Sequence, residues 1–180
     1  CAWFSCFVQE TNLSGTNLTD ADLTNANFAA AILTGADFTD AEIRGANFTA
    51  QASACNYWSF VCTTATGTGI TLAQLYSTAS YQAHDLSGVG FSYNNLAGAN
   101  FRQANLTNAS FYFATLTGAD FREANLANAH FGWANLTGAN FTGQNLSNFA
   151  FSGATLTDAD FTGADVRGVN FNIGGDCYEL

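Results

Sequence analysis

Residues 134–143 read ANLTGANFTG, two consecutive copies of one five-residue unit. Each copy has a large apolar residue at its centre, an alanine two positions before it and an asparagine directly before it. The same unit extends over residues 84–173, where every fifth residue from Leu86 to Phe171 is large and apolar. From Leu86 to Phe161 this residue alternates strictly between leucine and phenylalanine. An internal repeat of this regularity decides the fold.

The first part of the chain follows the same rule in a different phase. A period of five fits neither the 3.6-residue period of an α-helix nor the two-residue period of a β-strand. It fits a coil in which each unit forms one side of a square, with the large and the small residue pointing inward and Gly, Asn or Asp at the corners. The central residues of this first block are Trp3, Val8, Leu13, Leu18, Leu23, Phe28, Leu33, Phe38, Ile43 and Phe48.

Four sides give a coil of about 20 residues, and stacked coils would pair their backbones roughly 4.8 Å apart. We therefore predict an all-β fold, a quadrilateral β-helix of about seven coils with one inserted segment. Each buried phenylalanine ring removes on the order of 150–250 Å² from water and is the main stabilising contribution. The alternation places phenylalanine in two interior columns, one of Phe91, Phe111, Phe131 and Phe151 and one of Phe101, Phe121, Phe141 and Phe161.

The repeated unit resembles the A(D/N)LXX motif of the pentapeptide-repeat family. The resemblance covers about residues 1–50 and 84–173. It implies a right-handed quadrilateral β-helix. Relatives in that family include DNA-mimicking proteins that inhibit or protect DNA gyrase, and many members that are exported or of unknown role. The resemblance brings no shared catalytic residues.

Residues 51–83 interrupt the repeat and are predicted to form an insertion. Cys55 and Cys62 lie close enough in sequence for a disulfide to close a small loop. Residues 71–76 predict a short helix, because Thr71 and Gln74 have the spacing of a capping box. We expect one continuous domain: coils over residues 1–50, the insertion over 51–83, coils over 84–173 and a tail over 174–180.

If the insertion replaces no side of the square, Leu86 follows Phe48 directly, and the phenylalanine sides of the two blocks coincide. Any even number of replaced sides would make them coincide as well. With no side replaced, one outer edge carries Asp20, Asp22, Asp40 and Glu42 in the first block and Tyr93, Phe113 and Trp133 in the second.

The three aromatic residues lie 20 positions apart and should stack one per coil. An exposed row of this kind needs a cover or a partner. We expect the insertion to fold over it; the alternative is a docking surface for another molecule. The carboxylates on the same edge could bind Ca²⁺, but solvated acids are commoner, so we predict no metal and no cofactor.

The two ends of the repeat favour self-association. Cys1 and Cys6 already occupy the small inward position of the first two repeats, and little sequence follows Phe171. Solenoids normally carry caps, and uncapped ends favour head-to-tail contacts that build filaments. The residues expected at these contacts are Cys1, Trp3, Phe4, Cys6, Phe171, Ile173, Cys177 and Tyr178.

The use of the cysteines leaves several interpretations open. A bond from Cys177 to Cys1 or Cys6 of the next molecule would staple a stack. Alternatively, Cys1 and Cys6 merely fill the small inward position, which cysteine does well. A lipidated Cys1 is a third interpretation. With five cysteines, at least one is left unpaired or is used differently.

Composition limits the class of partner. The formal net charge of −10 and the absence of lysine argue against nucleic acid or an anionic membrane as partner. No apolar run approaches the roughly 20 residues of a membrane span. Five cysteines without lysine or methionine fit an exported, oxidised protein. We expect a secreted or cell-surface protein whose signal peptide has been removed; a trimmed chain is the alternative.

No pattern of a catalytic site is present. His84 and His130 have no second ligand at a metal-binding spacing, and phosphate-loop and nucleophile-elbow motifs are missing. Outward threonines 20 residues apart (Thr117, Thr137 and Thr157) form a narrow ladder that could bind ice or a polysaccharide.

Two hypotheses for the function follow. The first is a non-enzymatic exported structural protein that assembles with itself, head to tail, into an extracellular filament or sheath. The rival, motivated by a sequence pI of about 4.1 and by the family resemblance, is an acidic DNA mimic that binds DNA gyrase or another topoisomerase.

Overall fold

The computed structural model describes residues 11–56, 61–147 and 149–171, with the backbone alone over residues 52–65. Parallel bridges join residues 20 positions apart, as between Asn12 and Ile32 and between Asn100 and Asp120. The bridged residue is the one directly before each central residue. The backbone therefore closes one turn every four repeats, and the four-sided coil predicted from the period of five is confirmed.

The central residues and the alanines fill the interior of the coil. Leu136 and Phe141 are fully buried, as are Ala134 and Ala139. The phenylalanine rings form two stacked columns, with centroid distances of 4.9 Å between Phe111 and Phe131 and 5.0 Å between Phe121 and Phe141. The two columns meet edge to face, as Phe121 and Phe131 do at 5.2 Å. Both arrangements are favourable for aromatic rings.

We name the four sides of the C-terminal coils after one central residue each. Going around the coil, they are the Phe111 side (Phe91, Phe111, Phe131, Phe151), the Leu116 side (Leu96, Leu116, Leu136, Leu156), the Phe121 side (Phe101, Phe121, Phe141, Phe161) and the Leu126 side (Leu86, Leu106, Leu126, Leu146).

Local backbone structure explains why the repeat prefers particular residues at two of its positions. The residue before the centre is Asn or Asp because its side chain accepts the backbone N–H two residues on: Asn135 Oδ1 accepts from Thr137 at 3.1 Å and Asp120 Oδ1 from Arg122 at 3.0 Å. The residue two after the centre turns the corner in the left-handed region, at φ +66° in Gly138. Glycine adopts that conformation without a steric cost.

The insertion forms a hairpin and two short helices. Strand β1 (Gln51–Asn56) pairs antiparallel with β2 (Val61–Thr66), and α1 (Leu72–Ser77) and α2 (Ala79–Gln82) follow. The segment predicted as a short helix is α1, and its N-cap Thr71 forms the capping box with Gln74. The parallel ladder resumes at Asp85, which bridges Asn105.

The insertion takes the place of two sides of one coil. Asn47 bridges Gly90, 43 positions later, so Phe48 occupies the position of the preceding coil that corresponds to Phe91. The assumption that no side is replaced is therefore wrong, and the alternative of an even number is correct. Two sides amount to half a turn, so the edge below Tyr93 carries Ala50.

The acidic edge and the aromatic edge consequently lie on opposite corners of the rod. Asp40, which was expected to share an edge with Tyr93, instead donates its backbone N–H to the carbonyl of Ser77 in the insertion, at 2.9 Å. Asp22 and Glu42, which bridge one another, are followed along the rod by Asp85, because Ile43 stacks below Leu86.

Side chains of the insertion replace the missing ladder bonds. Gln74 Nε2 donates to the carbonyls of Leu33 and Ala36 at 2.8 and 2.9 Å, and the Leu33 N–H donates to Thr68 Oγ1 at 2.8 Å. Buried backbone groups need such partners. Ile70 and Leu75 are buried and continue the apolar interior.

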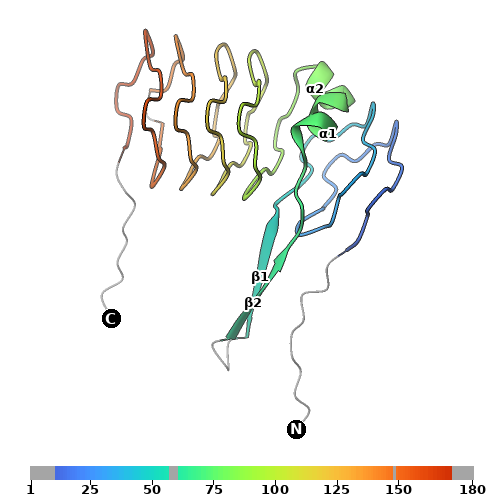
Figure 1. The fold of residues 1–180 in the computed structure, drawn as a ribbon. Coiled ribbons are helices and arrows are strands. Elements are labelled where there is room, and N and C mark those ends of the chain that lie inside the picture. Colours follow the sequence, from blue (N-terminus) through green and yellow to red (C-terminus); the bar gives the residue numbers. More distant parts are fainter. Residues whose placement is uncertain (1–10, 57–60, 148, 172–180) are drawn as a thin grey trace.

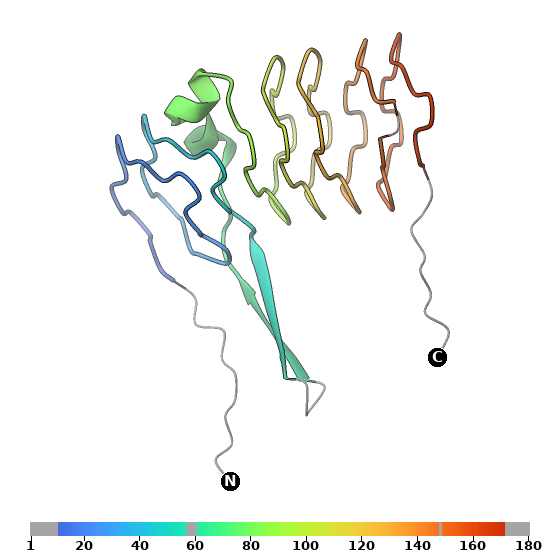
Figure 2. The ribbon, with the colours of Figure 1, turned by 180° about the vertical axis from the view of Figure 1, so that it is seen from behind.

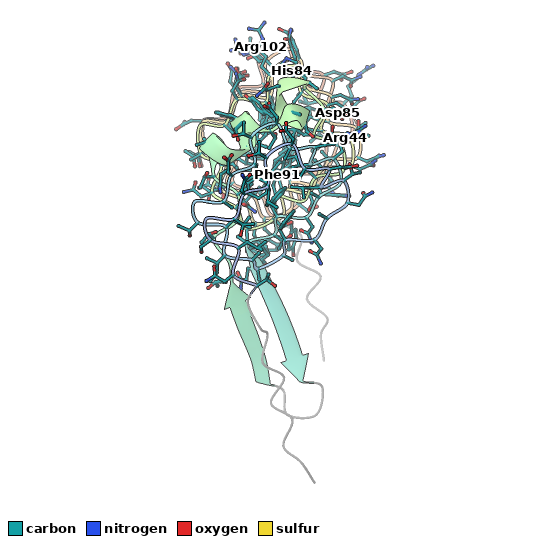
Figure 3. All side chains as sticks on the ribbon, turned by 90° about the vertical axis from the view of Figure 1, so that its right-hand side faces the viewer. Arg44, His84, Asp85, Phe91 and Arg102 are labelled. Carbon is teal, nitrogen blue, oxygen red and sulfur yellow. The ribbon has the colours of Figure 1, made fainter. Side chains whose placement is uncertain are left out.

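The whole molecule is a rod that bends at the insertion. Figures 1 and 2 show the N-terminal coils inclined to the C-terminal ones, the two helices at the junction, and the hairpin projecting from the rod. Figure 3 looks along the rod: Phe91 lies inside, Arg44, His84, Asp85 and Arg102 lie at the periphery, and the hairpin leaves on the side away from Arg102. Within the described residues, no helix has the length and hydropathy needed to cross a membrane.

Candidate functional site

Tyr93, Phe113 and Trp133, which we call the aromatic ridge, stack along one edge of the C-terminal coils. The ring centroids are 5.0 Å apart between Tyr93 and Phe113 and 5.9 Å apart between Phe113 and Trp133, with nearly parallel planes. The three side chains are 38%, 42% and 46% exposed. Because their faces cover one another, the ridge presents ring edges to solvent.

The ridge residues occupy strained backbone positions. Each is two residues after a central phenylalanine, at the corner where the repeat elsewhere has glycine, a short polar residue, alanine, Gln103 or Glu123. Their φ angles are +61°, +56° and +58° for Tyr93, Phe113 and Trp133. A bulky side chain in this left-handed region costs on the order of 1 kcal/mol per residue. Residues kept in costly conformations are concentrated at functional sites.

At the end of the ridge, the Trp133 ring packs against the backbone of the next coil. The next residue along the same edge is Gly153, and a Cβ built there would lie 2.6 Å from the Trp133 ring. Only glycine at this position lets the indole lie against the backbone.

A shallow groove of about 470 Å³ runs beside the ridge on the Phe111 side. Its floor consists of small residues, and Tyr112 and His130 border it. The Tyr112 ring is 4.6 Å from that of Phe113, edge to face. On the Phe111 and Leu116 sides, the residues directly before and after each central residue include no Asp, Glu, Lys or Arg; Asp158 lies at the far corner of the Leu116 side. Ridge and groove therefore form an uncharged surface with four exposed aromatic rings.

The described part of the insertion does not cover the aromatic ridge, whose three residues remain exposed. The Ala50 N–H donates to the carbonyl of Ser92 at 3.0 Å, and β1 begins at the next residue. The hairpin thus leaves the rod at the ridge edge, one coil before Tyr93, and projects outward (Figures 1 and 2). The expectation of a cover is wrong because the helices fill two sides of the coil and the hairpin is directed away from it.

The remaining predicted site residues fall into two groups. The backbones of Cys55 and Cys62 lie directly opposite each other in the hairpin register; their disulfide stays a prediction. Cys1, Trp3, Phe4, Cys6, Ile173, Cys177 and Tyr178 lie outside the described residues. Of the expected assembly residues, only Phe171 is described, and it is exposed.

In the described ranges every arginine is ion-paired, whereas Asp20, Asp22, Asp37, Asp40, Asp158 and Asp160 form no ion pair. Arg122 binds Asp120 at 2.7 Å and Arg167 binds Asp165 at 2.6 Å. Hydrogen bonding from Arg167 lowers the pKa of Asp165 to about 2. Between residues 11 and 171, with the gaps noted above, no three His, Cys, Asp or Glu side chains come together as a metal site would require.

Sequence reasoning missed three residues that shape this surface. Tyr112 was visible as an aromatic residue at a position that elsewhere holds Thr, Ser or another small or polar residue. Gln144 and Phe149 were visible as breaks in the column of inward alanines. The structural effect of Gln144 and Phe149 depends on how the neighbouring coils move apart to accommodate them.

Comparison with known proteins agrees with this architecture. The family model described as pentapeptide repeats matches eight copies, over residues 11–49, 85–122, 111–143 and 134–172. No curated protein matches the chain.

Solved structures of pentapeptide-repeat proteins resemble the chain at low sequence identity. A trypsin-treated form of QnrB1, a plasmid-mediated fluoroquinolone resistance protein, is 21% identical over 89% of this chain and 72% of its own, with a TM-score of 0.41. HetL, involved in the regulation of heterocyst differentiation in Nostoc sp. strain PCC 7120, is 23% identical over 93% of this chain and 87% of its own, with a TM-score of 0.40. A thylakoid-lumen protein of Arabidopsis thaliana is 34% identical over 48% of this chain and 64% of its own, with a TM-score of 0.27.

Proposed function

Because this chain belongs to the pentapeptide-repeat family, whose members form right-handed quadrilateral β-helices, we propose that it is a non-enzymatic binding protein that holds a partner protein against the aromatic ridge. One observation carries the proposal: three bulky aromatic residues occupy left-handed corners, one per coil, and remain exposed. Packing of the rod does not need them there, since glycine forms the same corner at Gly118 and Gly138.

The chemistry of the surface favours a protein over other partners. Aromatic residues are enriched at protein–protein interfaces, and charged residues are depleted at their centres. Nucleic acid requires a basic surface, whereas this chain carries a net charge of −10 and has only four arginines. A partner with an apolar groove can receive the ring edges of the ridge.

Photo-crosslinking in an extract of the source organism tests the proposal. The chain has no lysine, so a photoreactive phenylalanine derivative is placed at Phe113, and at Gln103 as a control. Gln103 holds the same corner position half a turn away, at φ +64°. We expect one protein to be crosslinked from position 113 only, and to be lost when Trp133→Gly is added. Equal crosslinking from both positions would contradict the proposal.

A second candidate function is the head-to-tail assembly into an exported filament or sheath. One observation favours it: Val166 and Phe171, both central residues of the last described coil, are 40% and 52% exposed. Such apolar side chains would be buried against the first coil of another copy. Export to the cell surface belongs to this candidate and rests on the cysteine usage alone.

Sedimentation velocity separates this candidate from ridge binding. Assembly through the coil ends predicts a concentration-dependent series of oligomers that Phe171→Asp shortens and that ridge substitutions leave unchanged. A single monomeric species at about 100 μM, far above the dissociation constants of specific assemblies, would rule out the filament.

The DNA-mimic hypothesis has less support in the charge arrangement. A mimic needs free carboxylates spaced along the rod. In the C-terminal coils, Asp120, Glu123 and Asp165 are paired with arginines, and among the described residues there only Asp158 and Asp160 are carboxylates without an ion pair. The supercoiling activity of a topoisomerase in the presence of this protein would remain unchanged under the binding-protein proposal.

A further inference from the structure

The wall of the rod is open at one place in its C-terminal half. Between neighbouring coils of the Leu126 side, Leu106 donates its N–H to the Asn125 carbonyl at 2.8 Å, and Asn125 donates to the Ala104 carbonyl at 2.9 Å. One coil further on, the corresponding bonds from Leu126 to Asn145 and from Asn145 to Ala124 are missing from the described part of the chain.

The gap continues around the corner onto the Phe111 side. His130 donates to the Ala109 carbonyl at 3.0 Å, but Ala150 makes no such bond to Ala129. Ladder pairing is retained on the other two sides, where Asn135 bridges Thr155 and Asn140 bridges Asp160. The two coils are therefore joined on two sides and parted on the other two.

Two oversized inward residues cause the parting. The repeat places alanine at the small inward position, as at Ala124 and Ala129, but the next coil has Gln144 and Phe149 there. Gln144 is buried and its Nε2 donates to the Phe121 carbonyl. The Phe149 ring lies 5.7 Å from Phe131 and 4.9 Å from Phe151.

The phenylalanine column of the Phe111 side is also distorted between these two coils. Phe111 and Phe131 stack at 4.9 Å and 7°, whereas Phe131 and Phe151, with Phe149 against both of them, are 6.0 Å apart and tilted by 35°. The opening has a volume of about 610 Å³ and is lined by Leu126 and Ala129, which are 5% and 7% exposed, next to unpaired backbone groups.

The opening presents a row of backbone donors and acceptors. By comparison with the preceding coil, the unpaired groups are the N–H of Glu123, Leu126, Asn128, Phe131, Asn145 and Ala150 and the C=O of Ala124, Ala129, Thr142, Asn145, Ser147 and Ala150. Such a row is a template for an added strand. Unmet backbone groups beside apolar side chains cost free energy until a partner satisfies them.

We propose that this opening is a binding site for an extended, uncharged peptide segment of a partner polypeptide, which pairs its backbone with the parted coils as an added β-strand. The polar side chains around the opening are Asn125, Asn128, His130, Gln144, Asn145 and Ser147, with no Asp, Glu, Lys or Arg among the lining residues. Backbone pairing supplies the affinity in this recognition mode, and the pockets select small or aliphatic side chains. The site does not depend on the ridge being a binding surface.

The first arm of the test is hydrogen exchange on the protein alone and with a probe peptide. The probe is an acetylated and amidated heptapeptide of alternating threonine and valine. We expect the amides of Leu126, Asn128 and Asn145 to exchange faster than those of Leu106, Asn108 and Asn125 without peptide, and to slow about tenfold with it. Equal protection of the two sets without peptide would overturn the proposal, since the wall would then be closed.

The second arm uses a matched peptide and a matched variant. The same heptapeptide with N-methyl groups on alternate amides keeps its side chains but loses backbone donors, and should not bind. Gln144→Ala with Phe149→Ala restores the alanine pattern and should remove both the fast exchange and peptide binding. Binding of the N-methylated peptide with unchanged affinity, or no slowing by the unmodified one, would overturn the proposal even if the variant fails to fold.

Discussion

At the scale of the residue, position in the five-residue unit decides what each side chain contributes. A central phenylalanine of the interior lies between two rings of its own column, as Phe121 does between Phe101 and Phe141. The same residue type at the corner, as in Phe113, is exposed and strained. Within the five-residue unit, the central position therefore stabilises the rod, and the corner position can present a side chain for binding.

Replacement of a column phenylalanine should be costly. Phe121→Ala leaves a cavity next to Phe101, Phe131 and Phe141, and we expect it to lower the free energy of unfolding by about 3–5 kcal/mol. Phe171→Ala is the control, because it removes the same side chain from the same repeat position where the ring is half exposed; it should cost at most about 1 kcal/mol. Urea denaturation measures both, and equal losses would contradict the interior columns.

The carboxylates before the central residues make stability depend on pH in the acid range. Hydrogen bonds from Thr24, Thr39 and Thr162 lower the pKa of Asp22, Asp37 and Asp160, and that of Asp165 falls to about 2. A depressed pKa in the folded state adds stability above the unfolded pKa of about 3.9, and this stability is lost as the pH falls through the folded value.

We therefore expect a constant melting temperature between about pH 7 and pH 5 and a decrease below about pH 4. Differential scanning calorimetry measures it. Asp165→Asn keeps the acceptor oxygen and should weaken the acid dependence; a melting temperature that rises below pH 4 would contradict the role of these carboxylates.

At the scale of the element, the insertion is the part that needs polar side chains to hold it. Gln74 satisfies two carbonyls of the N-terminal coils, and Ser80 donates to Glu42 while accepting the N–H of Ile43. These bonds replace a backbone ladder that the helices cannot continue. The junction of the two coil stacks is thus sealed by a few side chains.

Gln74→Ala should destabilise the junction. It leaves the carbonyls of Leu33 and Ala36 without their donor, and we expect a loss of about 1–3 kcal/mol in the free energy of unfolding. Gln82→Ala is the matched control, because this exposed amide makes only a long hydrogen bond of 3.4 Å to Ser77. Urea denaturation compares the two, and a Gln82 variant as unstable as the Gln74 variant would show that the seal is not specific.

The elements also show how far the sequence predicts this molecule. The coil, its two phenylalanine columns and α1 follow from a period of five and a capping box, which are local patterns. The number of sides that the insertion replaces does not follow, since zero and two place leucine on leucine and phenylalanine on phenylalanine alike. Because the insertion replaces two sides and not none, Tyr93 is aligned with Ala50 and not with Asp40. The sequence shows Gln144 as an exception at an inward position that usually holds alanine. Which sides of the two neighbouring coils separate in response depends on packing and does not follow from the sequence.

At the scale of the whole molecule, the rod combines a rigid interior with two uncharged features on adjoining surfaces. The groove beside the aromatic ridge and the opening in the wall share His130 and Ala150 among their lining residues. The hairpin leaves from the ridge edge at the bend of the rod (Figure 1). No Asp, Glu, Lys or Arg lines either feature, so we expect binding there to depend weakly on salt.

Central residues five apart in the sequence fill one four-sided interior, and the corner aromatic residues of the C-terminal coils remain in solvent. A crystal structure tests it most directly. We predict Phe91, Phe111 and Phe131 in one buried stack about 5 Å apart, with Tyr93, Phe113 and Trp133 exposed at positive φ on the adjoining edge. Electron density showing Tyr93, Phe113 and Trp133 turned into the interior, or buried under residues 51–66, would contradict the account.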